Sequence, residues 1–203
     1  MPDFTFENAA IAPVAGIDEA GRGPWAGPVV AAAVILPNDL PAELCGQIDD
    51  SKKLNRNVRE ALLAVLESTA QVGVGVATVS EIDELNILQA TMIAMHRAVS
   101  DLPAEPSTAL VDGNCAPELG CTVRTVVKGD ALSLSIAAAS VVAKVTRDRM
   151  MVKLAQKFPG YGWERNAGYG TKEHREAIVR LGVTSVHRGS FAPIREALTR
   201  YRQ

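Results

Sequence analysis

From residue 14 to residue 36 the chain reads VAGIDEAGRGPWAGPVVAAAVIL, and its two apolar runs indicate how the chain folds. VAGID, at 14–18, predicts a short strand that ends in a carboxylate. VVAAAVIL, at 29–36, lies between two prolines, which favours a buried strand although its alanines also suit a helix. The Gly-rich segment GRGPWAGP connects the two runs, so two strands are predicted to follow one another closely.

Further elements follow by the same criteria. Alternating or short apolar runs predict strands at 71–79, 108–112 and 121–127. The resulting order of strand, strand, helix, strand, helix, strand, strand and helix, then a loop and two helices, predicts an α/β protein with a mixed sheet covered by helices. Helical spacing and caps predict helices at 55–68, 80–102, 133–158 and 171–182, and a last short helix that Ser190 caps with Pro193 in its first turn.

Two of these helices carry more detailed predictions. In the 55–68 helix, the spacing predicts a buried face that contains Val58, Leu62, Val65 and Leu66. In the 80–102 helix, Ser80 and Asp83 resemble a capping box, and the apolar residues continue on one face for the whole length. The members of that face are Ile82, Leu85, Leu88, Met92 and Met95.

Length and composition limit the organisation and the class. The chain has 203 residues, 47% of them apolar, which suits one core with a small appendage. We expect an N-terminal extension at 1–13, a core at 14–158 and a helical appendage at 159–203. No apolar run is long enough to span a membrane, and the N-terminus does not resemble a signal peptide. Three cysteines without a CxxC pair favour the reducing cytoplasm.

Charge is distributed unevenly along the chain. Residues 1–143 hold 8 Lys/Arg and 18 Asp/Glu, whereas residues 144–203 hold 13 Lys/Arg and 5 Asp/Glu. An acidic part could hold cations while a basic part contacts phosphates, although solvated surfaces would give the same totals.

Four acids lie where predicted strands end or a helix is about to begin. Asp18 and Glu19 end the first strand, Asp112 ends TALVD, and Asp130 follows CTVRTVV in KGD. If these strands are neighbours, the acids meet at one edge of the sheet, where they would repel unless cations lie among them. Oxygen ligands of this kind suit Mg²⁺ or Mn²⁺, and two such ions can drive phosphodiester hydrolysis. As single residues, Asp130 could instead cap a helix, Asp112 form a turn and Asp18 start a loop.

The Gly-rich loop allows more than one interpretation. Gly21, Gly23 and Ala26 match a loose GxGxxA dinucleotide fingerprint, but a strand follows the loop where that motif requires a helix. A tight connection between two strands is a second interpretation. Close approach of backbone to a substrate, with Arg22 reaching a phosphate, is a third, and it fits the glycines better.

Seven motifs in this order resemble those of the type 2 ribonucleases H, the bacterial ribonuclease HII family. They cover nearly the whole chain, and the series is far more specific than any one member. The motifs are GIDEAGRGPWAGPVV at 16–30, DSKKL at 50–54, LVDGN at 110–114, KGD at 128–130, AAASVVAKVTRDRM at 137–150, GYGTKEH at 168–174 and HRGSF at 187–191.

The resemblance implies a ribonuclease H-like fold with a mixed five-stranded sheet. It implies that the four acids bind metal and are catalytic, and that Gly21, Arg22 and Gly23 sense the ribose 2′-hydroxyl through backbone groups. It implies that Tyr169 packs on the sugar at an RNA–DNA junction, and that Ser51 and Lys52 contact the backbone near the cut. The basic residues Lys144, Arg147, Lys172 and Arg188 are then interpreted as contacts to the duplex.

The resemblance also implies an activity. It is an endonuclease that uses two Mg²⁺ or Mn²⁺ ions, cuts RNA in RNA–DNA hybrids and incises 5′ of single ribonucleotides in duplex DNA. The products carry 3′-hydroxyl and 5′-phosphate ends, and the family is expected to act as a monomer. The chain departs from the pattern at Asn166 and Ala167, where relatives often have a basic residue, so one phosphate contact is in doubt. No stretch near Arg202 and Gln203 resembles a sliding-clamp-binding peptide, so that partner is not predicted.

Three other classes compete with this one. A non-catalytic binder on the same fold would gain from basic residues where four acids stand. A resolvase or transposase-like nuclease would need neither GRG nor GYGTKEH, and an oxidoreductase is disfavoured by the strand after the loop. A histidine base is not predicted either, because His96, His174 and His187 lack metal-ligand spacing and suit packing or positioning.

Overall fold

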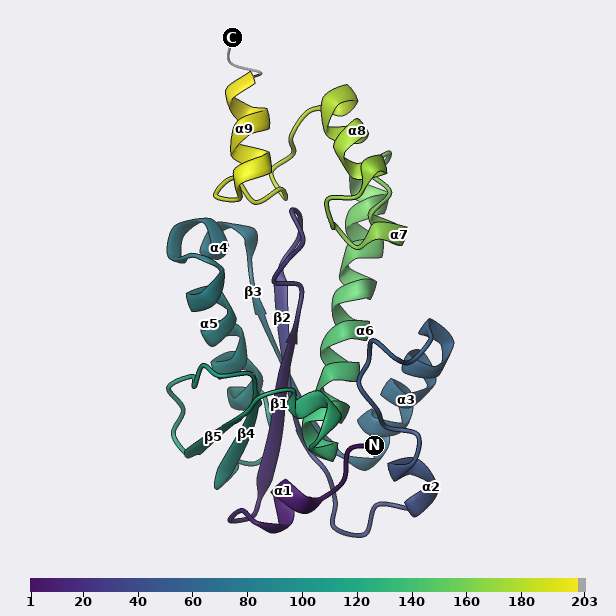
Figure 1. Cartoon of the computed structure of the whole chain (residues 1–203), viewed down its shortest axis with the longest axis vertical. Coiled ribbons are helices and arrows are strands. Elements are labelled where there is room, and N and C mark those ends of the chain that lie inside the picture. Colours follow the sequence, from purple (N-terminus) through teal and green to yellow (C-terminus); the bar gives the residue numbers. More distant parts are fainter. Residues whose placement is uncertain (201–203) are drawn as a thin grey trace.

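Five strands form one mixed sheet in the computed structural model, which describes residues 1–200 (Figure 1). The spatial order is β3-β2-β1-β4-β5, with β2 antiparallel to both of its neighbours and β1, β4 and β5 parallel. This confirms the predicted mixed α/β architecture. The strands are β1 (Val14–Ala20), β2 (Val29–Ile35), β3 (Gln71–Ala77), β4 (Thr108–Asp112) and β5 (Thr122–Val126).

Helices cover both faces of the sheet, and the C-terminal helices lie beyond its upper end in Figure 1. Helices α3 and α6 cover one face, while α4 and α5 cover the other. The helices are α1 (Thr5–Asn8), α2 (Ala42–Cys45), α3 (Arg56–Thr69), α4 (Val79–Leu85), α5 (Ile87–Ser100), α6 (Leu134–Lys157), α7 (Trp163–Asn166), α8 (Lys172–Leu181) and α9 (Ala192–Arg200), with a 3₁₀ turn at Gly129–Ala131. No helix in residues 1–200 is long and apolar enough to cross a membrane.

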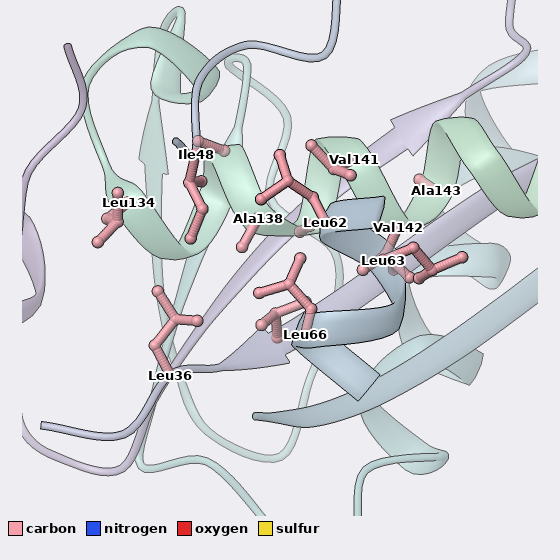
Figure 2. Packing of buried hydrophobic residues seen from close by; sticks show 14 of the residues in the cluster. Leu36, Ile48, Leu62, Leu63, Leu66, Leu134, Ala138, Val141, Val142 and Ala143 are labelled. Carbon is pink, nitrogen blue, oxygen red and sulfur yellow. The ribbon is translucent and has the colours of Figure 1, made fainter. Parts of the chain in front are cut away.

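Strand β2 shows why an alanine-rich run became a strand. All seven of its residues are buried, because it lies inside the sheet with helices on both faces. Small side chains at 31–33 let α5 and α6 approach the sheet closely. On the α6 side, Leu62 and Leu66 of α3 pack with Val141 and Val142 of α6 in a dense aliphatic cluster (Figure 2).

The start of α6 crosses β1 at a glycine. A Cβ atom on Gly16 would lie 2.1 Å from the backbone carbon of Ser135, so only glycine allows this crossing. The N-terminal residues secure the same point, because Glu7 Oε1 accepts hydrogen bonds from the Ser135 N–H at 2.9 Å and the Ser133 hydroxyl at 2.6 Å. A carboxylate there also opposes the positive end of the helix dipole. The beginning of α6, which follows Asp130, is therefore held firmly against β1.

A second, smaller apolar cluster joins the C-terminal helices to the body. Trp163 and Tyr161 stack with ring centroids 4.8 Å apart, and they pack with Ile178 of α8 and Ile194 of α9. Met151 of α6 and Ala26 of the β1–β2 loop belong to the same cluster. The C-terminal helices thus pack directly on that loop. Arg202 and Gln203 lie outside the described residues.

Several detailed predictions about the helices were wrong. Thr78, not Ser80, caps α4, because its side chain and that of Glu81 form the reciprocal capping box. Asp83 accepts hydrogen bonds from Ser190 instead, so Ser190 is engaged there and the last helix begins at Ala192. The predicted single helix at 80–102 is two helices, because Asn86 has a φ of 71°.

The predicted buried faces were only partly correct. In α3, Val58 and Val65 are exposed and Leu63 is buried instead. The side of α3 that packs against α6 is therefore rotated away from the centre of the apolar stripe. In the 80–102 segment, Leu85 and Leu88 are 38% and 36% exposed because the chain turns between them.

Candidate active site

Three aspartates from separate elements meet at one edge of the sheet. Ile17 of β1 pairs with Val111 of the parallel strand β4, so Asp18 and Asp112, the next residues, lie side by side on neighbouring strands. Asp130 comes from the 3₁₀ turn that precedes α6. One carboxylate oxygen of each aspartate lies within 4.8 Å of the others. Acids separated by up to 112 residues are thus brought together by strand order and by the start of α6.

The KGD turn orients this cluster. Lys128 adopts a left-handed conformation with a φ of 58°, which turns the Gly129 N–H toward Asp112 Oδ1 at 2.7 Å. The Lys52 ammonium reaches Asp130 Oδ2 at 2.9 Å although most of the lysine side chain is exposed. A lysine from the DSKKL motif therefore contacts the cluster directly.

The fourth predicted acid stands beside the cluster rather than in it. Glu19 is the neighbour of Asp18 on β1, and its Oε1 lies 3.3 Å from Arg22 Nη1. Glu19 is not among the residues whose oxygens all lie within 4.8 Å of one another. Its side chain lines the same cleft, so the acids form a close group of three with Glu19 at the margin.

The carboxylates repel one another electrostatically. Burial raises the pKa of Asp18 well above its usual value, and the charges of Glu19 and Asp112 add to this. Burial also raises the pKa of Glu19 and of Asp112, although Arg22 opposes the first effect and the Gly129 hydrogen bond the second. The hydrogen bond to Asp130 raises the pKa of Lys52, which keeps that lysine charged. Closely spaced buried oxygen ligands with raised pKa values are the donor set that a hard divalent cation would satisfy.

A cleft of about 360 Å³ is lined by Asp18, Glu19 and Asp112, whereas Asp130 lies outside its lining. It contains most of the residues that the sequence singled out for chemistry or for substrate contact. The lining residues are Asp18, Glu19, Ala20, Gly21, Arg22, Gly23, Ser51, Lys52, Asp112, Ser140, Lys144, Arg147 and Tyr169.

Tyr169 faces the Gly-rich loop across this cleft. The residue is 48% exposed, and a Cβ atom on Gly23 would lie 3.4 Å from its Cε1. The two segments are joined by a hydrogen bond from the Trp25 N–H to the Gly168 carbonyl at 2.8 Å. The exposed ring and the loop therefore form one surface beside the carboxylates.

The backbone N–H groups of Arg22 and Gly23 form no hydrogen bond within residues 1–200. Both residues line the cleft, so they offer two free donors near the acids. The positive φ of Gly21, 100°, is one that only glycine adopts easily.

The predicted basic contacts separate into different groups. Lys144 lines the cleft and pairs with Asp148 at 2.8 Å, while Ser51 is buried and its N–H donates to Ser140 Oγ at 3.2 Å. Lys172 is exposed on α8 outside the cleft lining, 3.8 Å from Glu176.

Arg147 and Arg188, which the sequence suggested as duplex contacts, are buried in this structure. They are 1% and 0% exposed, and their guanidinium groups donate to backbone carbonyls of the Gly-rich loop. Sequence did not indicate this burial, because residue type shows charge but not burial. For Arg147 a signal existed, since it stands four residues from both Ala143 and Met151 on the buried side of α6.

The histidines form a buried hydrogen-bond chain beneath Tyr169. The Thr184 N–H donates to His187 Nδ1 at 2.9 Å, so the neutral ring carries its proton on Nε2 and donates it to His174 Nε2 at 3.1 Å. Trp163 Nε1 also donates to that atom, which places the His174 proton on Nδ1, 2.9 Å from the Tyr169 carbonyl. Neither ring lines the cleft, which agrees with the predicted positioning role.

Known proteins show the same combination of sequence and fold. A family model for ribonuclease HII matches residues 15–194. Ribonuclease HII of Paramagnetospirillum magneticum is 60% identical over 96% of this chain and 97% of its own length. Ribonuclease HII of Rhodospirillum rubrum is 57% identical over 98% of this chain and 93% of its own length.

Solved structures agree in fold. The ribonuclease H2 of Pyrococcus horikoshii OT3 superposes with a TM-score of 0.78 at 30% identity and covers 94% of this chain and 99% of its own. A ribonuclease HII from Archaeoglobus fulgidus, solved in complex with PCNA, has a TM-score of 0.73 at 29% identity over 86% of this chain and 91% of its own. Bst-RNase HIII in complex with Mn²⁺, at 20% identity and a TM-score of 0.77, shares the fold.

The fold and its acidic cleft thus define a nuclease of the ribonuclease H type. Within that class, the chain belongs to the ribonuclease HII family, and it is an endoribonuclease.

Proposed function

We propose that this protein hydrolyses RNA in RNA–DNA hybrids and cuts on the 5′ side of single ribonucleotides embedded in duplex DNA, leaving 3′-hydroxyl and 5′-phosphate ends. One observation carries the proposal: Asp18, Asp112 and Asp130 lie within 4.8 Å of one another, and the first two line the same cleft as a loop with free backbone donors. The first feature serves phosphodiester hydrolysis, and the second can recognise the hydroxyl that distinguishes RNA from DNA.

The aspartates Asp18, Asp112 and Asp130, with Glu19 beside them, would hold two Mg²⁺ or Mn²⁺ ions. Bound there, such ions supply an activated water and stabilise charge on the leaving oxygen. Gly129 keeps Asp112 aimed at the cluster through its N–H, and Lys52 holds Asp130 and lies where a scissile phosphate would meet positive charge. The chain thereby contributes a fixed geometry for ligands and phosphate.

The Gly-rich loop and Tyr169 select the sugar. The free N–H groups of Arg22 and Gly23 donate to a ribose 2′-hydroxyl, and Arg22 is half exposed and can turn from Glu19 to a phosphate. Tyr169 stacks on the neighbouring sugar, where a deoxyribose fits more closely than a ribose. This arrangement favours a cut beside a junction, which suits the removal of ribonucleotides misplaced in cytoplasmic DNA.

Mapping the cut tests the proposal. A labelled DNA duplex with one ribonucleotide is incubated with Mg²⁺ or Mn²⁺, beside the same duplex made only of DNA and a long RNA–DNA hybrid. We expect one cut 5′ of the ribonucleotide, cuts within the hybrid RNA and none in the DNA duplex. An intact ribonucleotide strand with every divalent ion tried would falsify the proposal.

A further inference from the structure

Two arginines are buried behind the Gly-rich loop without an acidic partner. Arg188 is 0% exposed and donates to the carbonyls of Gly21 at 2.6 Å, Arg22 at 2.9 Å and Gly27 at 2.9 Å. Arg147 is 1% exposed. Neither arginine lies within ion-pair distance of a carboxylate in the part of the chain that the structure describes. Burying a cation is costly unless its donors are satisfied, so this arrangement needs an explanation.

The explanation lies in the geometry of the peptide unit. In a trans peptide, the carbonyl of one residue and the N–H of the next point in opposite directions. Arg188 draws the Gly21 and Arg22 carbonyls toward itself, so the N–H groups of Arg22 and Gly23 must point away from it. These are the two donors that are free and that belong to residues lining the cleft. One buried guanidinium therefore determines how both donors are aimed.

Arg147 links this loop to the segment that carries the tyrosine. Its Nε donates to the Pro28 carbonyl at 3.0 Å and its Nη2 to the Ala26 carbonyl at 3.2 Å, while its Nη1 reaches Ala167, two residues before Tyr169, at 3.0 Å. The side chain also passes directly over Gly21, where a Cβ atom would lie 1.9 Å from Arg147 Nε. The first glycine of GRG thus makes room for an arginine as well as adopting a positive φ.

Both side chains stay charged despite their burial. Burial lowers the pKa of Arg188 to about 9, helped by the nearby charge of Arg147, and lowers that of Arg147 to about 10. Two cations therefore lie under a loop that must receive a polyanion. A neutral residue of similar size could fill the space but could not orient several carbonyls at once.

We propose that Arg188 and Arg147 are positioning residues for sugar discrimination: Arg188 aims the Arg22 and Gly23 donors, and Arg147 fixes their spacing from Tyr169. This inference rests on the proposed function. It states that these arginines make the recognition of the ribose sugar accurate. Neither residue touches the reacting atoms.

The test compares Arg188→Lys and Arg147→Lys with a matched control, Arg180→Lys. Lysine keeps the charge but cannot present the planar fork, and Arg180 is an exposed arginine that also donates to a carbonyl, that of Gly160. Each variant is made alone and on an Asp112→Asn background, which prevents cutting. Turnover on the single-ribonucleotide duplex is measured with the first set. Affinity for that duplex and for an all-DNA duplex of the same sequence is measured with the second.

We expect kcat to fall about 10-fold to 100-fold in Arg188→Lys and Arg147→Lys, because small misplacements of recognition groups are costly. The affinity ratio between the ribonucleotide and all-DNA duplexes should fall toward one, while the affinity for the all-DNA duplex stays unchanged. The Arg180→Lys variant should match wild type in turnover and in both affinities. A merely structural role would weaken both affinities together. That result, or an unchanged ratio, would overturn the inference.

Circular dichroism sets an assay temperature at which each variant is folded. If Arg188→Lys does not fold, Arg147→Lys carries the test, with the same measurements and the same outcomes for and against the positioning role. Failure of the proposed function and failure of the positioning role give different results. Wild-type protein that does not cut beside a ribonucleotide refutes the proposed function, whereas wild-type protein that cuts there while the Lys variants keep the affinity ratio refutes only the positioning role.

Discussion

At the scale of single residues, Asp112 experiences two opposing influences. The Gly129 N–H stabilises its carboxylate, whereas burial and the neighbouring charge of Asp130 raise its pKa. An amide at this position would keep an oxygen for Gly129 and remove the repulsion. Function and stability therefore conflict at this side chain.

We predict that Asp112→Asn loses about 10³-fold or more in turnover, because a ligand of the proposed ions is gone. In metal-free buffer the same variant should melt higher than wild type, by about 2–4 °C for each kcal/mol of repulsion removed. His174→Ala serves as the contrast: it should retain much of its activity at a temperature where it is folded, since its ring lies outside the cleft. Equal losses of turnover in the two variants would contradict this assignment.

Tyr169 allows a second test of a single side chain. Its ring is half exposed and contacts the Gly-rich loop, so removing the ring should leave the fold intact. We predict that Tyr169→Ala lowers kcat/KM at a single-ribonucleotide junction about 10-fold or more while binding to the duplex changes little. Tyr169→Phe keeps the ring and should behave as wild type. Normal cutting by Tyr169→Ala would show that the ring does not sense the junction.

At this scale, the sequence indicated the position of the cleft aspartates more clearly than that of the buried arginines. Asp18, Asp112 and Asp130 each follow an apolar strand or precede a helix, and strand order brings such positions together. Arg188 gave no comparable signal, because HRGSF contains no periodic apolar pattern that would place it inside. A charged residue was therefore assigned to the surface, where most such residues lie.

At the scale of elements, local signals predicted helix ends well where a cap was unambiguous. Thr171 caps α8 as predicted and Gly182 ends it, while Ser133, the first residue of the predicted 133–158 helix, caps α6. The α4–α5 break escaped prediction because Asn86 lies within a continuous apolar pattern. Only its backbone, with φ 71° and ψ 165°, separates the helices.

This break predicts an unusual response to substitution. Asn86 caps α5 by accepting from the Leu88 N–H at 2.9 Å and the Gln89 N–H at 3.2 Å, but its backbone conformation is one that mainly glycine tolerates. We expect Asn86→Ala to lose about 1 kcal/mol of unfolding free energy with the cap. Asn86→Gly should gain about 1 kcal/mol, because relief of strain exceeds the small loss of the cap. Urea unfolding measures both, and an alanine variant more stable than wild type would contradict this account of the cap.

At the scale of the whole molecule, the distribution of charged residues along the chain is more informative than the net charge. The basic last third includes Arg147 and Arg188, which are buried, so fewer cations face solvent than the sequence suggests. The mixed five-stranded sheet agrees with the sequence-based architecture, since local patterns predict the strands and the resemblance implies the fold, whereas the spatial order of the strands came from the structure. The packing of the last helices on the β1–β2 loop came only from the structure, because no local pattern encodes contact between segments so far apart.

Stability should depend on pH through the histidine chain. Burial lowers the pKa of His187 to about 4, and the His174 ring beside it adds to the effect. An unfolded chain binds that proton near pH 6.5, so the free energy of unfolding should decrease as the pH falls from about 6.5 to 4, by about 3 kcal/mol for this residue. Below pH 4 both states are protonated and the decrease stops.

The cleft carboxylates, whose pKa values are raised, act in the opposite direction over part of this range. A His187→Asn variant isolates the histidine contribution, because the carboxylates are common to both proteins. Chemical unfolding at several pH values should show a smaller acid-side decrease in the variant. Identical profiles would mean that His187 is protonated in the folded state.

The order in which the ribosome makes these parts has a consequence for the cell. The three aspartates are already present in a nascent chain that has reached residue 130, whereas the arginine that aims the loop appears only at residue 188. A polypeptide that ends before residue 188 has the acids and the Gly-rich loop but lacks the guanidinium that we propose aims the loop donors. If the proposed role of Arg188 is correct, sugar discrimination is the last property that synthesis completes, and a product that ends before residue 188 should lack it.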